Sequence, residues 1–456
     1  AFSAESLQQL IEQHPLVDDS SKRIKLAVLT NSTYDGLCYN TDMIKSQLHD
    51  SVDVLHFDEA WFGYAAFHPF YHGRHGMSEP AEAPRTKHAL VFATQSPHKV
   101  LAALSQASII LAKNSAEQQL DHERFNEAYM MHTSTSPHYG MIASIDVATG
   151  MMAGPAGRSL VQETLDEALS FRRAMQQTAE QMAEEEWWFD VWEPEASLAQ
   201  AELQATDWTL DDQAEWHGFG KMSSDFAMLD PIKVSLLTPG VEEKGRLAKS
   251  GIPAALVTRF LAERGLVVEK TGLYSFLILF SLGITKGKWS TLLSELREFK
   301  RLYDQDSPLE VTLPSLARHP SYQSLGLRAL GERLHQCYKK HSLIKLMRQM
   351  YTTLPQISLR PADAYQQMVR GEVESVPVSA LAGRLSAVML VPYPPGIPVI
   401  MPGERFPLDN SYIADYLAAA IELEEQFPGF ANDIHGLRME QFDGQVNWRG
   451  GCLIEG

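Results

Sequence analysis

The chain has little cysteine, fewer basic than acidic residues, and no long apolar run. Only three cysteines occur among its 456 residues, and they lie far apart, so the sequence predicts reduced thiols in a cytoplasmic protein and no disulfide framework. The formal net charge of −18 argues against nucleic acid as a partner, because phosphates would repel the protein. The longest apolar run, around residues 276–280, is too short to cross a bilayer, so we expect no membrane partner.

A metal site is equally poorly supported by the sequence. His68, His72 and His75 lie close together in a segment that also contains glycine and proline. Their spacing would suit zinc, but no set of cysteines or carboxylates accompanies them to complete the four ligands that zinc takes. We therefore predict that the protein holds no metal.

Two short apolar segments are each followed by polar residues. Residues 52–57 and 88–92 are rich in β-branched and aromatic side chains, which predicts two strands. Asp58 follows the first segment, and a polar cluster that ends at Lys99 follows the second. In an open α/β sheet ligands bind at the carboxyl ends of strands, so we expect Asp58 and Lys99 to share one pocket.

This pair of side chains suits pyridoxal phosphate. A lysine amine forms a Schiff base with the cofactor aldehyde, and a carboxylate facing the pyridine nitrogen keeps the ring protonated as an electron sink. Ser96 and His98 would donate hydrogen bonds to the cofactor phosphate. The tetrapeptide from Ser96 to Lys99 is also typical of a polar surface loop, so the prediction depends on its surroundings.

Six segments, spread from about residue 30 to about residue 400, carry a resemblance to a known family. They are residues 31–36, 57–61, 93–99, 127–137, 229–234 and 392–398. In this order they resemble the bacterial ornithine/lysine/arginine decarboxylases, which have an aminotransferase-like fold and use pyridoxal 5'-phosphate. The resemblance implies an α/β fold, and the pattern of strand-like and helix-like segments along the chain predicts three parts. Residues 1–150 would be the end of a fold type I large domain, 151–295 a smaller α+β subdomain, and 296–456 a C-terminal α+β domain.

The resemblance also implies a role for each candidate residue near the cofactor. Lys99 would bind the cofactor covalently, and Asp58 would pair with the pyridinium. Trp61 would lie beside the cofactor, and Ser96 and His98 would contact the phosphate or flank the Schiff base. Lys99 and His98 are the candidate donors of the proton that replaces carbon dioxide.

Assembly follows from the same resemblance. In this family the active site lies between two subunits, so Ser134 would reach the phosphate bound by the partner subunit, and a homodimer would be the smallest competent unit. Relatives go on to form decamers. The family places a phosphate-binding loop and a ring-stacking histidine well upstream of the Asp58 position. Only 57 residues precede Asp58 here, so we expect the chain to be the C-terminal part of a longer protein.

The substrate is predicted to be a basic amino acid. Residues 265–272 resemble the segment in which lysine and ornithine decarboxylases present a glutamate to the distal ammonium of the substrate, which makes Glu269 the candidate substrate-binding residue. Residues 58–64 and 287–289 look closer to acid-induced arginine decarboxylases. We therefore rank L-lysine, giving cadaverine, before L-arginine and L-ornithine, and an exposed strand-end carboxylate is the alternative interpretation of Glu269.

Two functions from other classes remain open at this point. An aminotransferase on the same fold would need an arginine for the α-carboxylate of a second substrate. A catalytically silent relative would act as a binding or regulatory subunit, but packing alone requires neither Lys99 nor Asp58.

Overall fold

The computed structural model describes residues 4–17, 24–48, 51–78, 89–183, 186–194, 203–212, 214–242, 245–393, 396–408, 412–430, 433–442 and 445–455. His88, Pro394 and Pro395, which belong to the segments 88–92 and 392–398, lie outside them. The chain divides into two compact units. The first contains residues 1–183, 191–235 and 277–291, and the second contains residues 184–190, 236–276 and 292–456.

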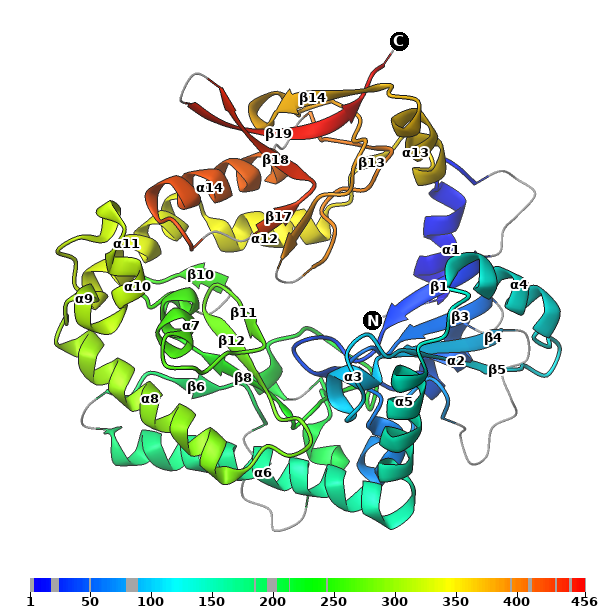
Figure 1. Cartoon of the computed structure of the whole chain (residues 1–456), viewed down its shortest axis with the longest axis horizontal. Coiled ribbons are helices and arrows are strands. Elements are labelled where there is room, and N and C mark those ends of the chain that lie inside the picture. Colours follow the sequence, from blue (N-terminus) through cyan, green and yellow to red (C-terminus); the bar gives the residue numbers. More distant parts are fainter. Residues whose placement is uncertain are drawn as a thin grey trace. The chain divides into compact units, whose positions relative to one another are not determined.

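Four strands form the main sheet of the first unit, in the order β1-β3-β4-β5 (Figure 1). They span Ile24–Thr30, Val52–Asp58, Leu90–Gln95 and Ile109–Lys113. β1, β3 and β4 are parallel, and β5 runs antiparallel to β4. The two predicted strands are confirmed, although β4 begins at Leu90 and continues to Gln95. The register places Asp58 between Thr30 and Thr94, at the carboxyl ends of three parallel strands.

One face of this sheet is covered by α2, Thr41–Leu48. Ile44 and Leu48 of this helix pack against Leu55 and Phe57 of β3, and all four are buried. Burial of each such side chain contributes roughly 1.5–3 kcal/mol to folding. Successive side chains of a strand point to opposite faces, so the alternation that buries Leu55 and Phe57 also directs residue 59 to the covered side.

Three helices follow the sheet in the sequence. They are α4, His122–His132, α5, Tyr139–Met152, and α6, Gly154–Gln181. α4 buries none of its residues and α5 buries only two, whereas α6 buries a continuous face. The sequence predicts a single helix over residues 160–186. The observed helix begins earlier, at Gly154, whose φ of +63° separates it from α5.

A second four-stranded sheet has the order β11-β12-β8-β6. Its strands span Lys270–Thr271, Ser275–Leu279, Lys233–Leu237 and Asp190–Val191. The sequence predicts a strand over residues 187–192, but only Asp190 and Val191 form one. The Trp188 ring packs instead on Phe299 and Tyr303, with ring centroids 6.2 and 5.3 Å apart.

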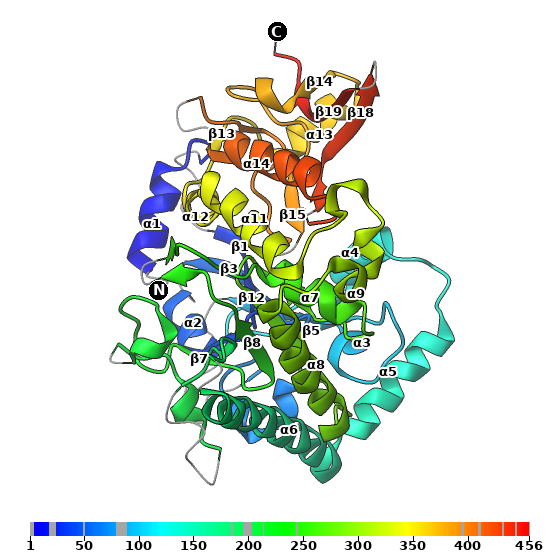
Figure 2. The ribbon, with the colours of Figure 1, turned by 90° about the vertical axis from the view of Figure 1, so that its left-hand side faces the viewer.

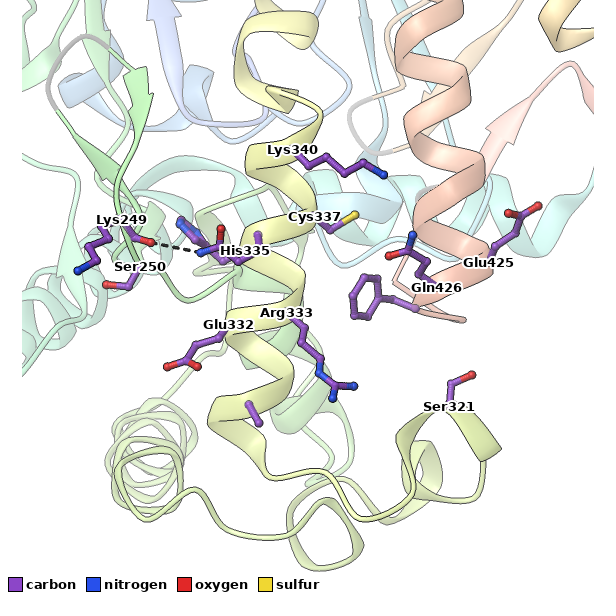
Figure 3. Close-up of a pocket in the computed structure, with 13 residues that line it drawn as sticks. Lys249, Ser250, Ser321, Glu332, Arg333, His335, Cys337, Lys340, Glu425 and Gln426 are labelled. Atoms are coloured by element: carbon purple, nitrogen blue, oxygen red, sulfur yellow. Dashed lines mark hydrogen bonds between the residues drawn. The ribbon is translucent and has the colours of Figure 1, made fainter.

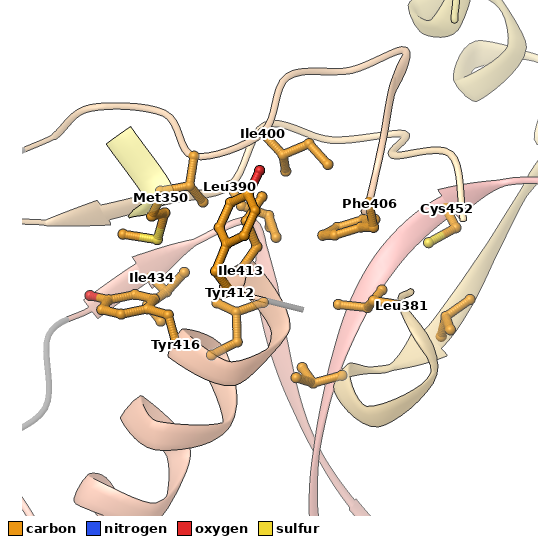
Figure 4. Packing of buried hydrophobic residues seen from close by; sticks show 14 residues of the cluster. Met350, Leu381, Leu390, Ile400, Phe406, Tyr412, Ile413, Tyr416, Ile434 and Cys452 are labelled. Atoms are coloured by element: carbon orange, nitrogen blue, oxygen red, sulfur yellow. The ribbon is translucent and has the colours of Figure 1, made fainter. Parts of the chain in front are cut away.

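The second unit ends in helices and a three-stranded antiparallel sheet of order β14-β19-β18, Val373–Pro377, Gln445–Leu453 and Leu437–Phe442. Its helices include α7, Ala254–Ala262, α11, Leu327–Lys340, α12, Leu343–Thr352, α13, Pro361–Val369, and α14, Tyr412–Gln426. Figures 1 and 2 show α12 and α14 packed on each other. Their core contains Met350, Leu390, Ile413 and Ile434 (Figure 4). The predicted mixed α/β architecture is confirmed.

Candidate active site

Asp58 is the last residue of β3, the central parallel strand of the first sheet. Its side chain is half-buried, and Oδ1 accepts a hydrogen bond from the Ala60 backbone N–H at 3.1 Å. No basic side chain among the described residues forms an ion pair with it. Asp58 is therefore a carboxylate at the carboxyl ends of the parallel strands, and it has capacity to accept further hydrogen bonds.

Lys99 reaches the same edge from β4. The chain leaves β4 at Gln95 and turns into the short helix α3, Pro97–Val100, in which the Lys99 N–H donates to the Ser96 carbonyl at 2.9 Å. Pro97 starts this helix because its fixed φ suits the first helical position. The Lys99 Nζ lies 4.7 Å from the centroid of the Trp61 ring. The structure thus brings Lys99 next to Trp61, which follows Asp58 by three residues.

Trp61 is itself held by an aromatic neighbour. The Tyr34 ring, in the loop after β1, lies 5.6 Å from it, centroid to centroid, at an interplanar angle of 49°. Loops that follow three adjacent parallel strands therefore contribute Tyr34, Trp61 and Lys99 to one cluster. An aromatic face favours a cation or a planar ligand beside it.

The other two residues of the predicted phosphate cluster have different surroundings. The Ser96 hydroxyl makes no capping hydrogen bond to α3. His98 Nδ1 lies 2.6 Å from the Ala107 carbonyl oxygen, so this nitrogen carries the proton and donates. Nε2 is then the nitrogen that remains for another partner.

Ser134 and Glu269 lie elsewhere in the chain. Ser134 is exposed in the loop between α4 and α5, where its Oγ accepts from the Ser136 N–H at 3.1 Å. Glu269 belongs to the second unit and is exposed just before β11. No hydrogen bond within the described part of the chain joins Ser134 to Asp58, Ser96 or Lys99.

The sequence reasoning missed a buried carboxylate next to Asp58. Glu59 is fully buried, and its carboxylate accepts from the Gly76 N–H at 2.5 Å, Gln95 Nε2 at 3.0 Å and Asn31 Nδ2 at 3.3 Å. Burial raises the pKa of Glu59, while these donors oppose the increase. The available signal was strand alternation, which places residue 59 on the covered side after Leu55 and Phe57.

A second buried carboxylate, Asp230, lies in the segment at residues 229–234. Asp230 accepts from the hydroxyls of Tyr71, at 2.7 Å, and Tyr64. Burial raises the pKa of Asp230, whereas the nearby Lys233 ammonium lowers it. The Lys233 Nζ in turn donates to the Thr33 carbonyl at 3.0 Å. These bonds fix the loops after β1 and β3, which also carry Tyr34 and Trp61.

Other features of the described residues offer no competing site. They contain no group of three His, Cys, Asp or Glu that could hold a metal, and His68 instead contacts Gln162 Oε1 at 3.1 Å. None of their helices combines the length and apolar character that crossing a membrane requires. A groove of about 1220 Å³ lies along α11 in the second unit, lined by mixed charges that include Arg333, Lys340 and Glu332 (Figure 3). It contains none of the predicted catalytic residues.

The sequence matches the ornithine/lysine/arginine decarboxylase major domain over residues 1–288 and the C-terminal domain of the same enzymes over residues 344–454. The chain belongs to the ornithine/lysine/arginine decarboxylase family. Among its members, a lysine decarboxylase of Pseudomonas aeruginosa is 57% identical over 441 residues, which are 96% of this chain and 58% of that protein. The biodegradative arginine decarboxylase of Escherichia coli is 40% identical over 452 residues, 95% of this chain and 59% of that protein.

A solved structure shares the fold of this decarboxylase-family chain. Lysine decarboxylase A from Pseudomonas aeruginosa superposes with a TM-score of 0.94 at 55% identity, over 99% of this chain and 60% of that one. The chain therefore spans less than two thirds of the length of these relatives. The family resemblance deduced from six short segments is confirmed.

Proposed function

We propose that this chain forms part of a pyridoxal-phosphate-dependent enzyme that decarboxylates L-lysine to cadaverine and carbon dioxide. The observation that carries the proposal is the Lys99 amine, 4.7 Å from the Trp61 ring centroid, at the same sheet edge as Asp58. Identity of 57% to a lysine decarboxylase, against 40% to an arginine decarboxylase, supports L-lysine over L-arginine, which would give agmatine. L-Ornithine, giving putrescine, is the third candidate.

The side chains at this edge fit the cofactor. The Lys99 Nζ has no hydrogen bond or ion pair to another described side chain, so its lone pair is available when the amine is neutral. Asp58 offers an acceptor for a ring N–H, and the Ser96 hydroxyl is not used to cap α3. The donor set therefore combines a nucleophile, an anion and an indole face.

The residues of the chain have separable tasks in this reaction. When bound, the cofactor supplies a conjugated ring that takes up the electron pair left at Cα as carbon dioxide departs. Asp58 accepts the hydrogen bond of the ring nitrogen and keeps its proton in place. Trp61 packs beside Lys99 and excludes water from the amine. Lys99 or His98 returns a proton to Cα, so each turnover consumes one proton.

Substrate choice is assigned to Glu269. A carboxylate that pairs with the distal ammonium fixes the chain length of the substrate by its distance from the reacting carbon. Glu269 is exposed just before β11, and the family resemblance of residues 265–272 is what supports its role.

A homodimer is proposed as the working unit, with Ser134 contributing to the phosphate site of the partner. The loop that carries Ser134 joins α4 and α5, which both expose large apolar side chains. Met131 is 75% exposed, Tyr139 78% and Val147 59%. Apolar residues that remain exposed together on two successive helices are typical of an association surface.

Location and domain division are also proposed. All three cysteines are buried free thiols, which supports a reducing compartment such as the cytoplasm. The division at residue 295 is supported by a major-domain match that ends at residue 288, and the division at residue 150 is proposed from the sequence pattern alone.

The decisive experiment measures carbon dioxide release and cofactor absorbance in the intact protein with L-lysine, L-arginine and L-ornithine in turn. We expect release from L-lysine, and its loss in Lys99→Ala but not in Lys25→Ala, whose side chain is 84% exposed. Cofactor binding without gas from any of the three would favour the aminotransferase alternative. Neither binding nor gas would favour the silent relative.

A further inference from the structure

Glu59 connects three loops at the carboxyl edge of the first sheet. Its Oε1 accepts from the Asn31 amide, in the loop after β1, and from the Gly76 N–H, at the far end of the loop that follows β3. Its Oε2 accepts from the Gln95 amide at the end of β4. One buried carboxylate therefore receives donors from the loops after β1 and β3 and from the last residue of β4.

The bond to Gln95 links the two predicted catalytic residues most directly. Glu59 is the residue after Asp58, and Gln95 is the residue before the segment from Ser96 to Lys99. The Glu59 N–H also donates to the Thr94 carbonyl at 2.9 Å, so backbone and side chain both join β3 to β4 at this point. A displacement of either strand end would be transmitted to the other through this pair.

The amide of Gln95 is confined on its other side as well. A Cβ atom built at Gly63, in the loop that carries Trp61, would lie 3.4 Å from Gln95 Oε1. Gln95 is buried, with its amide between Glu59 and this loop. The Glu59 and Gln95 pair therefore fixes Trp61 and Lys99 relative to Asp58.

The side chain at residue 59 must accept hydrogen bonds. All three partners of the Glu59 carboxylate are N–H groups, and a carboxylate has acceptor capacity for each of them. An apolar side chain would leave the Gly76 N–H and the Gln95 amide without this acceptor, while Asn31 Nδ2 would keep its hydrogen bond to the Arg74 carbonyl. The three donors thus provide a reason for a buried carboxyl side chain at this position.

We propose that Glu59 is a positioning residue, which sets the relative placement of Asp58 and Lys99 through its hydrogen bond to Gln95. This inference rests on the proposed roles of Asp58 and Lys99 in holding pyridoxal phosphate. It assigns to Glu59 no contact with substrate or cofactor. The expected result of losing the pair is a looser cofactor site in a protein that remains folded.

The test measures cofactor binding and does not depend on turnover. Pyridoxal phosphate is titrated into the apo form of the intact protein, and the Lys99 bond is trapped by borohydride reduction and located by mass spectrometry. Glu59→Leu and Gln95→Leu should each weaken cofactor affinity and slow trapping by about tenfold to a hundredfold. The double variant should be no worse than Glu59→Leu alone, because Glu59→Leu already removes the hydrogen bond to Gln95.

Conservative and control variants separate positioning from stability. Glu59→Gln keeps an acceptor for Gly76 and Asn31, and a reversed Gln95 amide can accept from it, so binding should return to within a few-fold of the original. Leu48→Ala is the stability control, because it creates a cavity in the core that packs against β3 and β4. It should lower thermal stability without changing cofactor affinity.

Several outcomes would overturn the inference. Normal cofactor affinity in Glu59→Leu or Gln95→Leu contradicts it, and so do additive losses in the double variant. If Glu59→Leu fails to fold, Gln95→Leu decides alone. Trapping at a residue other than Lys99 in the unmodified protein would refute the proposed function instead, so the two failures are distinguishable.

Discussion

The hydroxyl of Tyr71 donates a hydrogen bond to the Asp230 carboxylate at 2.7 Å, and both side chains are closed to solvent. Tyr71 lies in the loop that follows Asp58 and Trp61, whereas Asp230 lies 159 positions further along the chain. A distant turn of the first unit therefore anchors the loop of the candidate active site. The Tyr64 hydroxyl donates to the same carboxylate and doubles this anchor.

Removing this anchor should destabilise the first unit. Asp230→Ala leaves two buried hydroxyls without their acceptor and the Lys233 ammonium without its nearby counter-charge, so we expect the free energy of unfolding to fall by about 3–5 kcal/mol. Tyr71→Phe removes one hydrogen bond and should cost about 1 kcal/mol. Urea unfolding curves measure both changes. Equal losses in the two variants would show that Asp230 is not the common acceptor on which the loop depends.

The indole of Trp61 should contribute to cofactor affinity. Trp61→Leu removes the aromatic face beside the Lys99 amine, worth about 1 kcal/mol, so pyridoxal phosphate should bind about fivefold more weakly. Trp61→Phe retains an aromatic face and should recover most of the affinity. Absorbance titration of the cofactor measures the difference. If Trp61→Leu binds the cofactor as tightly as the unmodified protein, Trp61 does not contribute to the cofactor site.

Glu269 should determine substrate preference. Glu269→Gln removes the charge that pairs with the distal ammonium, so kcat/KM for L-lysine should fall about tenfold to a hundredfold with little change in cofactor affinity. Glu242→Gln, another exposed carboxylate of the second unit, is the matched control. Unchanged kcat/KM values for L-lysine and L-arginine in Glu269→Gln would leave the exposed strand-end carboxylate as the better interpretation.

Acid should weaken the fold through His75. Burial and the nearby Lys45 ammonium lower the pKa of His75 from 6.5 to about 4, so the folded state favours the neutral ring. The neutral His75 ring therefore contributes at most about 3 kcal/mol to the free energy of unfolding. This contribution is fully present above the pKa of His75 in the unfolded state and is lost as the pH falls towards its pKa in the folded state. His75→Asn should therefore lose less unfolding free energy between about pH 7 and about pH 4. Parallel curves for the two proteins would contradict this.

Charge on the α4 and α5 surface should disrupt association. Met131→Asp and Val147→Asp place carboxylates on exposed apolar positions, so we expect a dimer of the intact protein to dissociate while its secondary structure is retained. Leu354→Asp, at a position that is 83% exposed in the second unit, is the control. Light scattering measures the mass. A mass unaffected by both surface variants would place the dimer interface elsewhere.

The local sequence pattern was sufficient to predict the strands and the candidate residues at their ends. It was insufficient to predict the long-range contacts that hold these residues in place. β3 and β4 follow from β-branched and aromatic composition, and Asp58 and Lys99 stand out because each follows a strand. Asp230 does not stand out, because its partners Tyr64 and Tyr71 lie far away in the sequence. Trp188 misled the strand prediction for the same reason, since its packing on Phe299 and Tyr303 is a long-range contact that composition does not reveal.

The division of the chain also bears on how the protein is synthesised. The first unit is assembled from three stretches, and the last one, residues 277–291, is translated after the whole of the segment 236–276, which belongs to the second unit. A nascent chain therefore cannot complete its first folded body until well over half of the polypeptide has been made. During that interval the apolar face of α6 lacks Phe280 and Trp289, on which its Phe171 packs, and chaperone binding to this face would guard against aggregation.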